Sequence, residues 1–412
     1  MSPKRRRAAA VVVAVALVAL GTAGCLAPRG ATWQNPPSST GPTSAPPPTA
    51  SPTPSATQTV SAEDACVTSI LSKMTLRQIA GQVMLVGTPI GDPTSVDDVA
   101  RQYAVGGVFL AGRYKASASS LRAAITTVKA AAPQGVGFLI ALDQEGGEVQ
   151  TLQGPDFPPI PTAQAQGQLS QSTLKSQTEA WAHRLAALGI NLDLAPVADT
   201  VPASLGTGNP PIGAFHRQYG SDPTKVAAAI STVVKAIQST GVITTLKHFP
   251  GLGRVRENTD FSKDAVDSVE TAHDPYLQPF AAGISAGTGA VMMSLASYPK
   301  LDSHTIAAFS EPIVTGLLRN QLGFTGLIVS DALGGAAAAT IVPLGQRAVR
   351  FIQAGGDLAL TTQASKAPAM IDGLVGAAQG SASFRTTLTA AATHVLRTKY
   401  TAGLLSCSPA QP

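Results

Sequence analysis

The chain contains Thr244-Thr245-Leu246-Lys247-His248-Phe249-Pro250-Gly251-Leu252-Gly253, and it continues without a break as Arg254-Val255-Arg256-Glu257-Asn258-Thr259-Asp260. An apolar, β-branched run ends abruptly in Lys247 and His248, and a turn of proline and glycine leads into a polar loop. This pattern is typical of a buried parallel strand that delivers charged groups at its carboxyl end. In a β/α barrel, that end of the strands carries the chemistry.

Seven further apolar runs alternate with helical patterns on both sides of this stretch. Strands are predicted at Val83–Gly87, Gly107–Leu110, Phe138–Leu142, Ile190–Asp199, Ala290–Ser294, Leu327–Asp331 and Asp357–Leu360. The helices between them are predicted at Val96–Tyr103, Ser119–Ala131, Ser170–Leu188, Asp222–Thr240, Pro275–Ala286, Glu311–Leu322 and Leu344–Ala354. Short helices within 63–80 should cover the barrel floor, and two more, near 367–377 and 384–400, should close the domain.

This alternation predicts an α/β fold with parallel strands, and eight strands favour a single closed (β/α)8 barrel of the TIM type. The alternative is an open, doubly wound sheet. It lacks support because no strand is followed by the Gly-x-Gly-x-x-Gly pattern of dinucleotide-binding sheets.

The amino terminus predicts a bacterial lipoprotein signal. Lys4–Arg7 supply four of the charges behind the net charge of +5, and they precede an apolar run, Ala8–Leu20, and small residues before Cys25. Cleavage before Cys25 would leave 5 − 4 = +1, since residues 1–24 hold no acidic residue. A net charge this close to zero argues against nucleic-acid binding. Cys25 is then the lipidation site that holds the protein at the extracytoplasmic face of the cell membrane; the alternative is an uncleaved membrane anchor.

Residues 25–61 are rich in Pro, Ser and Thr and nearly free of charge, which predicts a flexible linker before a barrel domain at 62–408. The other two cysteines, Cys66 and Cys407, lie near the two ends of that domain. Outside the cytoplasm, such a pair is expected to form a disulfide, because the two ends of a barrel are adjacent in space.

Polar residues gather at the carboxyl ends of the predicted strands and in the loops after them: Asp143, Glu145, Asp199, Arg217, Lys247, His248, Asp260 and Asp331. Taken singly, each has an ordinary structural role, such as a helix cap for Asp331 or an arginine partner for Glu145 and Asp199. Their convergence on one rim favours a functional site. Cys/His spacing for zinc is missing, so no metal or cofactor is expected. Carboxylates beside cations suit the cleavage of glycosidic bonds.

On these residues the chain resembles the family 3 glycoside hydrolases, in particular the single-barrel β-N-acetylglucosaminidases. The likeness spans about 70–365. Its motifs are Asp143–Gly147, Gly189–Asn191 with Ala195–Val197, Ile212–Gly213 with Arg217–Gly220, Lys247–Gly253 and Val329–Asp331. The resemblance implies that Asp331 is the nucleophile and forms a covalent glycosyl–enzyme. It also implies that Asp143, Arg217, Lys247 and His248 bind the hydroxyls of the terminal sugar.

One departure from the family pattern affects the proton donor. Members of this branch carry Asp-Ser-His in the loop where this chain has Asn258-Thr259-Asp260. We hypothesise that Asp260 has taken the acid/base role and that Asn258 orients it. The alternative is a loop that has lost its catalyst. The segment that leads to Arg217 is also two residues longer than in the usual form.

The resemblance therefore predicts a monomeric, retaining exo-β-N-acetylglucosaminidase that acts on peptidoglycan fragments. Two other functions remain open. One is a non-catalytic lipoprotein that binds cell-wall glycan, and the other is an exo-β-glycosidase of different sugar specificity.

Overall fold

The structure is a computed structural model that describes residues 61–407. The predicted signal peptide, the lipidation site Cys25 and nearly all of the predicted linker lie outside the described residues. Within them, no helix has the length and apolar character that a membrane span requires.

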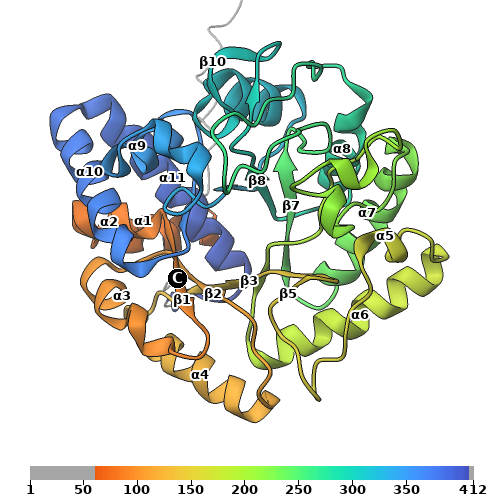
Figure 1. Ribbon diagram of the computed structural model, residues 1–412. Coiled ribbons are helices and arrows are strands. Elements are labelled where there is room, and N and C mark those ends of the chain that lie inside the picture. The colour runs from red at the N-terminus through yellow and green to blue at the C-terminus, as the bar shows by residue number, and fades with distance from the viewer. Residues whose placement is uncertain (1–60, 408–412) are drawn as a thin grey trace, which may run out of the picture. The chain divides into compact units, whose positions relative to one another are not determined.

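Eight parallel strands form a barrel surrounded by helices, as predicted (Figure 1). The strands are β1 (Met84–Pro89), β2 (Gly107–Ala111), β3 (Leu139–Leu142), β6 (Leu192–Asp193), β7 (Ile243–Phe249), β8 (Ala290–Met293), β11 (Leu327–Ser330) and β12 (Ala359–Thr361). β1 pairs with both β2 and β12, and a parallel bridge from Val329 to Leu358 joins the last two strands. The ring of strands is thereby closed.

Successive side chains of each strand point alternately into the barrel and towards the helices, and they form two apolar cores. Leu85, Phe109 and Met292 belong to the apolar cluster that fills the barrel, whereas their neighbours Val86 and Val108 belong to the larger cluster beneath the helices. Because successive side chains of a strand point to opposite faces, both faces must be apolar when helices cover the outside. This explains the continuous apolar runs in the sequence.

The outer layer consists of α3 (Asp97–Tyr103), α4 (Ala118–Ala130), α6 (Gln171–Leu188), α7 (Pro223–Gln238), α8 (Gln278–Ser285), η6 (Pro312–Gln321) and α9 (Leu344–Gln353). Local sequence sets their ends. The Asp222 side chain accepts hydrogen bonds from the first turn of α7, and Pro223 occupies its first position. Gly189 ends α6 with a φ of 80°, a conformation that glycine adopts at little cost.

Two elements differ from the prediction. The fourth strand, β6, spans only Leu192–Asp193 of the predicted Ile190–Asp199. Pro196 cannot donate a backbone hydrogen bond, and beyond it the pairing with β7 continues only as a bridge from Val197 to Lys247. The helix predicted at Glu311–Leu322 is present, but it is a π-helix. The loops at the mouth of the barrel also hold two small hairpins that were not predicted: β4 (Gln144–Gly146) with β5 (Val149–Gln150), and β9 (Ser297–Tyr298) with β10 (Asp302–Ile306).

Four helices cover the floor and side of the barrel: α1 (Ala62–Leu71), α2 (Leu76–Gln82), α10 (Ala367–Gly380) and α11 (Ala382–Thr401). Lys399 of α11 is fully buried there, and its Nζ donates to Oε1 of Gln82 at 2.8 Å. Burial lowers the pKa of Lys399 to about 7. A disulfide joins Cys66 of α1 to Cys407, with 5.7 Å between the Cα atoms.

Replacing both disulfide cysteines by serine is expected to lower the free energy of unfolding by about 2–5 kcal/mol, because the bond closes nearly the whole domain into one loop. Urea denaturation at pH 7 measures the loss. Reduction of the unmutated protein should reproduce it. An unchanged midpoint in both experiments would contradict the prediction.

Candidate active site

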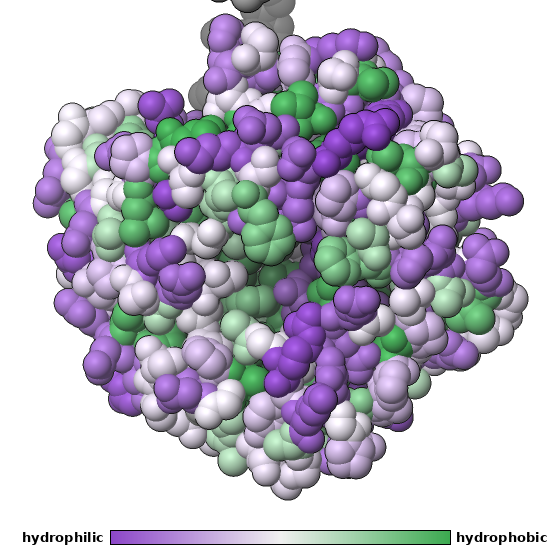
Figure 2. All heavy atoms as spheres, in the orientation of Figure 1, coloured by the Kyte–Doolittle hydropathy of each residue, from purple (hydrophilic) through white to green (hydrophobic). Residues whose placement is uncertain are grey.

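A cavity of about 250 Å³ opens at the carboxyl ends of the barrel strands. Figure 2 shows a hollow at the centre of the molecule with apolar residues at its bottom. The floor is formed by Phe109, Leu194, Met292 and Leu360, which are also the upper residues of the barrel core. The walls are polar and include Asp143, Arg217, Lys247, His248, Asn258, Asp260 and Asp331.

A larger cavity of about 800 Å³ lies at the opposite end of the strands. Its charged lining residues are already paired: Arg319 and His394 contact Asp357, and Arg397 contacts Asp64. The amino-terminal end of a β/α barrel generally serves stability. The smaller cavity at the mouth is therefore the candidate active site.

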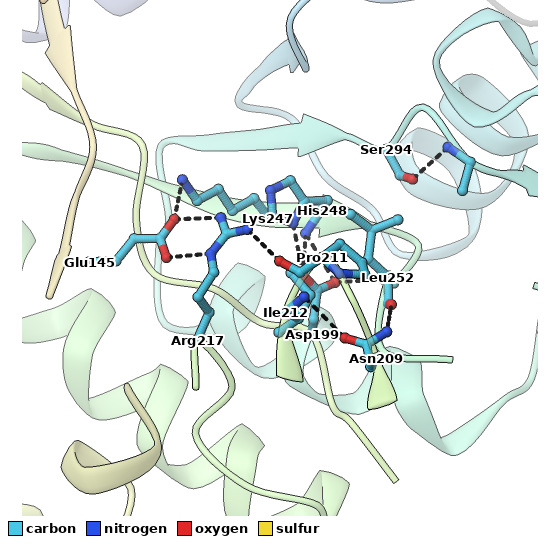
Figure 3. Close-up of polar contacts among 12 residues, drawn as sticks. Glu145, Asp199, Asn209, Pro211, Ile212, Arg217, Lys247, His248, Leu252 and Ser294 are labelled. Carbon is cyan, nitrogen blue, oxygen red and sulfur yellow. Dashed lines mark hydrogen bonds and ion pairs between the residues drawn. The ribbon is translucent and has the colours of Figure 1, made fainter. Parts of the chain in front are cut away.

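Glu145 is the centre of a buried ionic network on one wall (Figure 3). Its carboxylate accepts two hydrogen bonds from Arg217, at 2.7 and 2.8 Å, and lies 2.6 Å from Nζ of Lys247. Lys247 also donates to Asp143 at 2.6 Å. Burial alone would raise the pKa of Glu145, but the charges of Arg217 and Lys247 outweigh it and lower this pKa to about 2. The two cations are thus held in fixed positions, and three of the four residues line the cavity.

Asp199 holds His248 in place. The two side chains meet at 2.8 Å through Nδ1 of His248, and Oδ1 of Asp199 accepts the backbone N–H groups of His248 and Leu252 at 3.1 and 2.8 Å. Because Asp199 occupies Nδ1, the other ring nitrogen, Nε2, is the one available to a ligand in the cavity.

Two carboxylates from different loops, those of Asp260 and Asp331, line another part of the cavity wall. Asp331 directly follows β11, and its Oδ1 accepts the backbone N–H of Ala332 at 2.7 Å. Asp260 lies in the loop after β7, and two backbone hydrogen bonds, from Ala337 to its carbonyl and from Ala338 to that of Thr259, tie this loop to the one after β11. Partial desolvation, and then the negative charge of Asp331, raise the pKa of Asp260.

The residues predicted within the barrel for catalysis and for sugar binding all line this one cavity. Glu145 and Asp199 lie behind the lining. Glu145 binds Arg217, the arginine partner that its structural interpretation anticipated, whereas Asp199 binds His248 where an arginine was expected. Asn258 does not contact the carboxylate of Asp260. Its Oδ1 accepts the backbone N–H of Asp260 at 2.9 Å, so it fixes the turn.

Sequence reasoning missed two buried residues that support the site. Asn209 bonds to Leu252 and Val255 in the loop after β7 and to Ile212 and Gly213 in its own loop, and so joins the two loops. Its signal in the sequence is weak, because asparagine is common in loops. Asp193 had a clearer signal, since it is an acidic residue inside the mostly apolar run that was predicted as the fourth strand.

Asp193 accepts the backbone N–H of Gln144 at 3.1 Å and is 2% exposed. Burial raises its pKa to about 7. In the unfolded chain it ionises near pH 4, so the folded state binds the proton more tightly. Between pH 4 and 7 its contribution therefore makes the protein less stable as the pH rises.

Asp193→Asn should remove this loss while still accepting the Gln144 hydrogen bond. As the pH rises from 5 to 8, the free energy of unfolding of the variant is expected to increase by about a few kcal/mol relative to that of the unmutated protein. Thermal unfolding at both pH values measures the difference. Parallel pH profiles for the two proteins would contradict it.

Comparison with known proteins gives a consistent result. Residues 75–398 match the family described as glycosyl hydrolase family 3 N terminal domain. A β-hexosaminidase of Stenotrophomonas maltophilia (strain K279a) is 34% identical over 315 residues, which cover 72% of this chain and 87% of that protein. The crystal structure of a β-N-acetylhexosaminidase from Beutenbergia cavernae is 43% identical, with a TM-score of 0.76, over 79% of this chain and 98% of that one. A family 3 β-N-acetylglucosaminidase from Paenibacillus sp. is 27% identical, with a TM-score of 0.72, over 82% of this chain and 65% of that one.

Proposed function

Since this chain belongs to glycosyl hydrolase family 3, and is thus a glycoside hydrolase, we propose that it is a retaining exo-β-N-acetylglucosaminidase. The substrate we propose is the terminal β-linked N-acetylglucosamine of peptidoglycan fragments. The observation that carries the proposal is the placement of two carboxylates, Asp331 and Asp260, on one cavity with a cationic cluster. The choice of sugar is supported by the β-N-acetylhexosaminidase and β-N-acetylglucosaminidase that the chain resembles.

The size of the cavity supports exo action. Its volume of about 250 Å³ lies just below the ~300–1,000 Å³ of typical small-molecule sites, and its floor is closed by the barrel core. A single sugar unit fits such a blind pocket, whereas the interior of a glycan chain would need an open cleft. The bond to be cleaved then lies at the mouth.

In the first chemical step, an oxygen of Asp331 bonds to the anomeric carbon while the bond to the leaving oxygen breaks. Asp260 gives that oxygen its proton. In the second step, Asp260 takes a proton from water, the water oxygen attacks the same carbon, and the bond to Asp331 breaks. Two inversions release N-acetylglucosamine with its configuration retained. Side chains and water suffice, so the proposed reaction needs no cofactor.

The remaining polar residues would bind the sugar. Lys247 and Arg217 offer N–H donors to hydroxyl oxygens, Asp143 offers an acceptor, and His248 offers Nε2. Because Glu145 and Asp199 hold these groups before the substrate arrives, little further ordering is required when it binds. The lipid anchor at Cys25 would keep a monomeric enzyme beside the cell wall, on the extracytoplasmic face of the membrane.

Release of p-nitrophenol from its β-N-acetylglucosaminide by the full-length protein tests this function, with the β-glucoside as the comparison. Faster cleavage of the N-acetylglucosaminide is expected, and the sugar should appear first as the β-anomer in NMR spectra. Preference for the glucoside would reassign the sugar. Binding of N-acetylglucosamine in calorimetry without any cleavage would favour the non-catalytic glycan-binding alternative, which the change at Asn258 and Asp260 motivates.

A further inference from the structure

Large apolar side chains are exposed only at one end of the described part of the barrel. They are Phe215, Phe261, Val266, Val269 and Ile341. All five lie in loops that follow the carboxyl ends of β6, β7 and β11, at the same end of the barrel as the candidate active site. Phe261 stands out because 84% of it is exposed. An exposed aromatic ring beside a ligand cavity suggests a binding surface.

The backbone at Phe261 is fixed. Its N–H donates to the carbonyl of Asn258 at 3.0 Å and closes a tight turn over Asn258–Phe261. The Asn258 side chain braces this turn from inside, and Ala337 and Ala338 bond to it from the neighbouring loop. The preceding residue, Asp260, lines the cavity. Phe261 therefore directly follows the proposed proton donor, on a turn whose backbone is held by hydrogen bonds, and most of its ring is exposed.

We propose that Phe261 is the platform on which the leaving group of the substrate stacks, and that this leaving group is a second sugar ring. The inference rests on the proposed function. Asp260 can protonate the leaving oxygen only from hydrogen-bonding distance, and the cavity holds a single sugar. The group attached to that oxygen must consequently lie outside the cavity, beside the residue that follows Asp260.

The chemistry of the ring specifies the class of leaving group. Phenylalanine has no hydrogen-bonding group, so it recognises only a flat, apolar surface. A pyranose presents such a surface through the C–H groups of one face, whereas a small alcohol does not. The substrates selected by Phe261 are thus β-linked disaccharides and longer glycans.

Phe261→Ala tests the platform in the full-length protein with two substrates, N,N′-diacetylchitobiose and methyl β-N-acetylglucosaminide. We expect kcat/KM for the disaccharide to fall about tenfold, mostly through KM, and kcat/KM for the methyl glycoside to stay unchanged. Aryl glycosides are unsuitable, because their own ring would stack on Phe261. Phe261→Trp should keep the wild-type ratio of the two values. Val269→Ala, which removes another exposed apolar side chain of the same loop, is the matched control and should change neither value.

Equal losses on both substrates would overturn the platform and show that Phe261 only supports the turn. An unchanged disaccharide value would overturn it as well, as would a wild-type enzyme that prefers the methyl glycoside. Failure of the wild type on both substrates is a different result: it would contradict the proposed function itself, and the platform with it.

Discussion

Asp331→Asn is expected to reduce turnover of a β-N-acetylglucosaminide by a factor on the order of 10⁴ or more, because an amide cannot form the covalent intermediate. The loss should fall on kcat and not on the binding of N-acetylglucosamine. The substitution conserves shape, and the amide oxygen can still accept the Ala332 N–H that orients the side chain in the native protein. The thermal midpoint should thus change little.

The control for this substitution is Asp264→Asn, which removes an exposed carboxylate from the loop after β7 and should leave activity intact. Trapping offers a direct check: the unmutated enzyme is incubated with a 5-fluoro derivative of N-acetylglucosaminyl fluoride, which keeps the 2-acetamido group, then quenched with acid and digested, and peptide mass analysis should place the label on Asp331. Substantial activity in Asp331→Asn, or a label on another residue, would contradict the assignment.

The buried network beside these carboxylates is tolerable because its charges balance. Asp143 and Glu145 face Lys247 and Arg217, two anions against two cations. Burying an unpaired charge is costly, whereas a balanced and fully hydrogen-bonded group is much less so. Asp193 adds a third carboxylate with no further cation to pair with it. Burial first, and then the nearby charges of Asp143 and Glu145, raise the pKa of Asp193 to about 7, whereas Arg217 and Lys247 lower that of Glu145 to about 2.

The sequence predicted the features that depend on the periodicity of apolar residues and on the position of polar residues at strand ends. A parallel strand buried on both faces must be continuously apolar, so polar residues at strand ends, such as Lys247 and Asp331, were recognisable as members of one rim. The closed barrel followed from the same pattern, and the eight strands are present.

The features that depend on side-chain partners could not be predicted in this way. Nothing in the sequence shows that Glu145 bonds to Arg217, 72 residues away, or that Asn209 bridges two loops. The length of the fourth strand also depends on tertiary context, because the strand stops at Asp193 although apolar residues follow at 194–198. Asp193 is a different case: an acid in a mostly apolar strand is visible in the sequence, but its burial and its contact with Gln144 are not.

Asp260→Ala is expected to slow cleavage of N,N′-diacetylchitobiose by about 10²–10⁴-fold, since the leaving sugar must be protonated as its bond breaks. The 2,4-dinitrophenyl glycoside should lose far less in kcat/KM, because its leaving group departs as a stable anion. Its kcat should still fall, as water must now attack the intermediate without a base. Azide needs no base, so it should restore that kcat and yield the β-glycosyl azide.

The electrostatics of the cavity would allow one carboxyl group, that of Asp260, to serve as both the proposed acid and the proposed base. In the free enzyme, desolvation and the charge of Asp331 raise the pKa of Asp260, so its proton is retained to higher pH. In the proposed mechanism, the bond to the sugar would neutralise Asp331, which would lower the pKa of Asp260 and leave a carboxylate ready to accept a proton from water. The alkaline limb of kcat/KM for the disaccharide should therefore report Asp260 and disappear in Asp260→Ala. If Asp260→Ala instead lost kcat/KM equally for the disaccharide and for the 2,4-dinitrophenyl glycoside, and kept the alkaline limb, the acid role would belong to another group at the mouth.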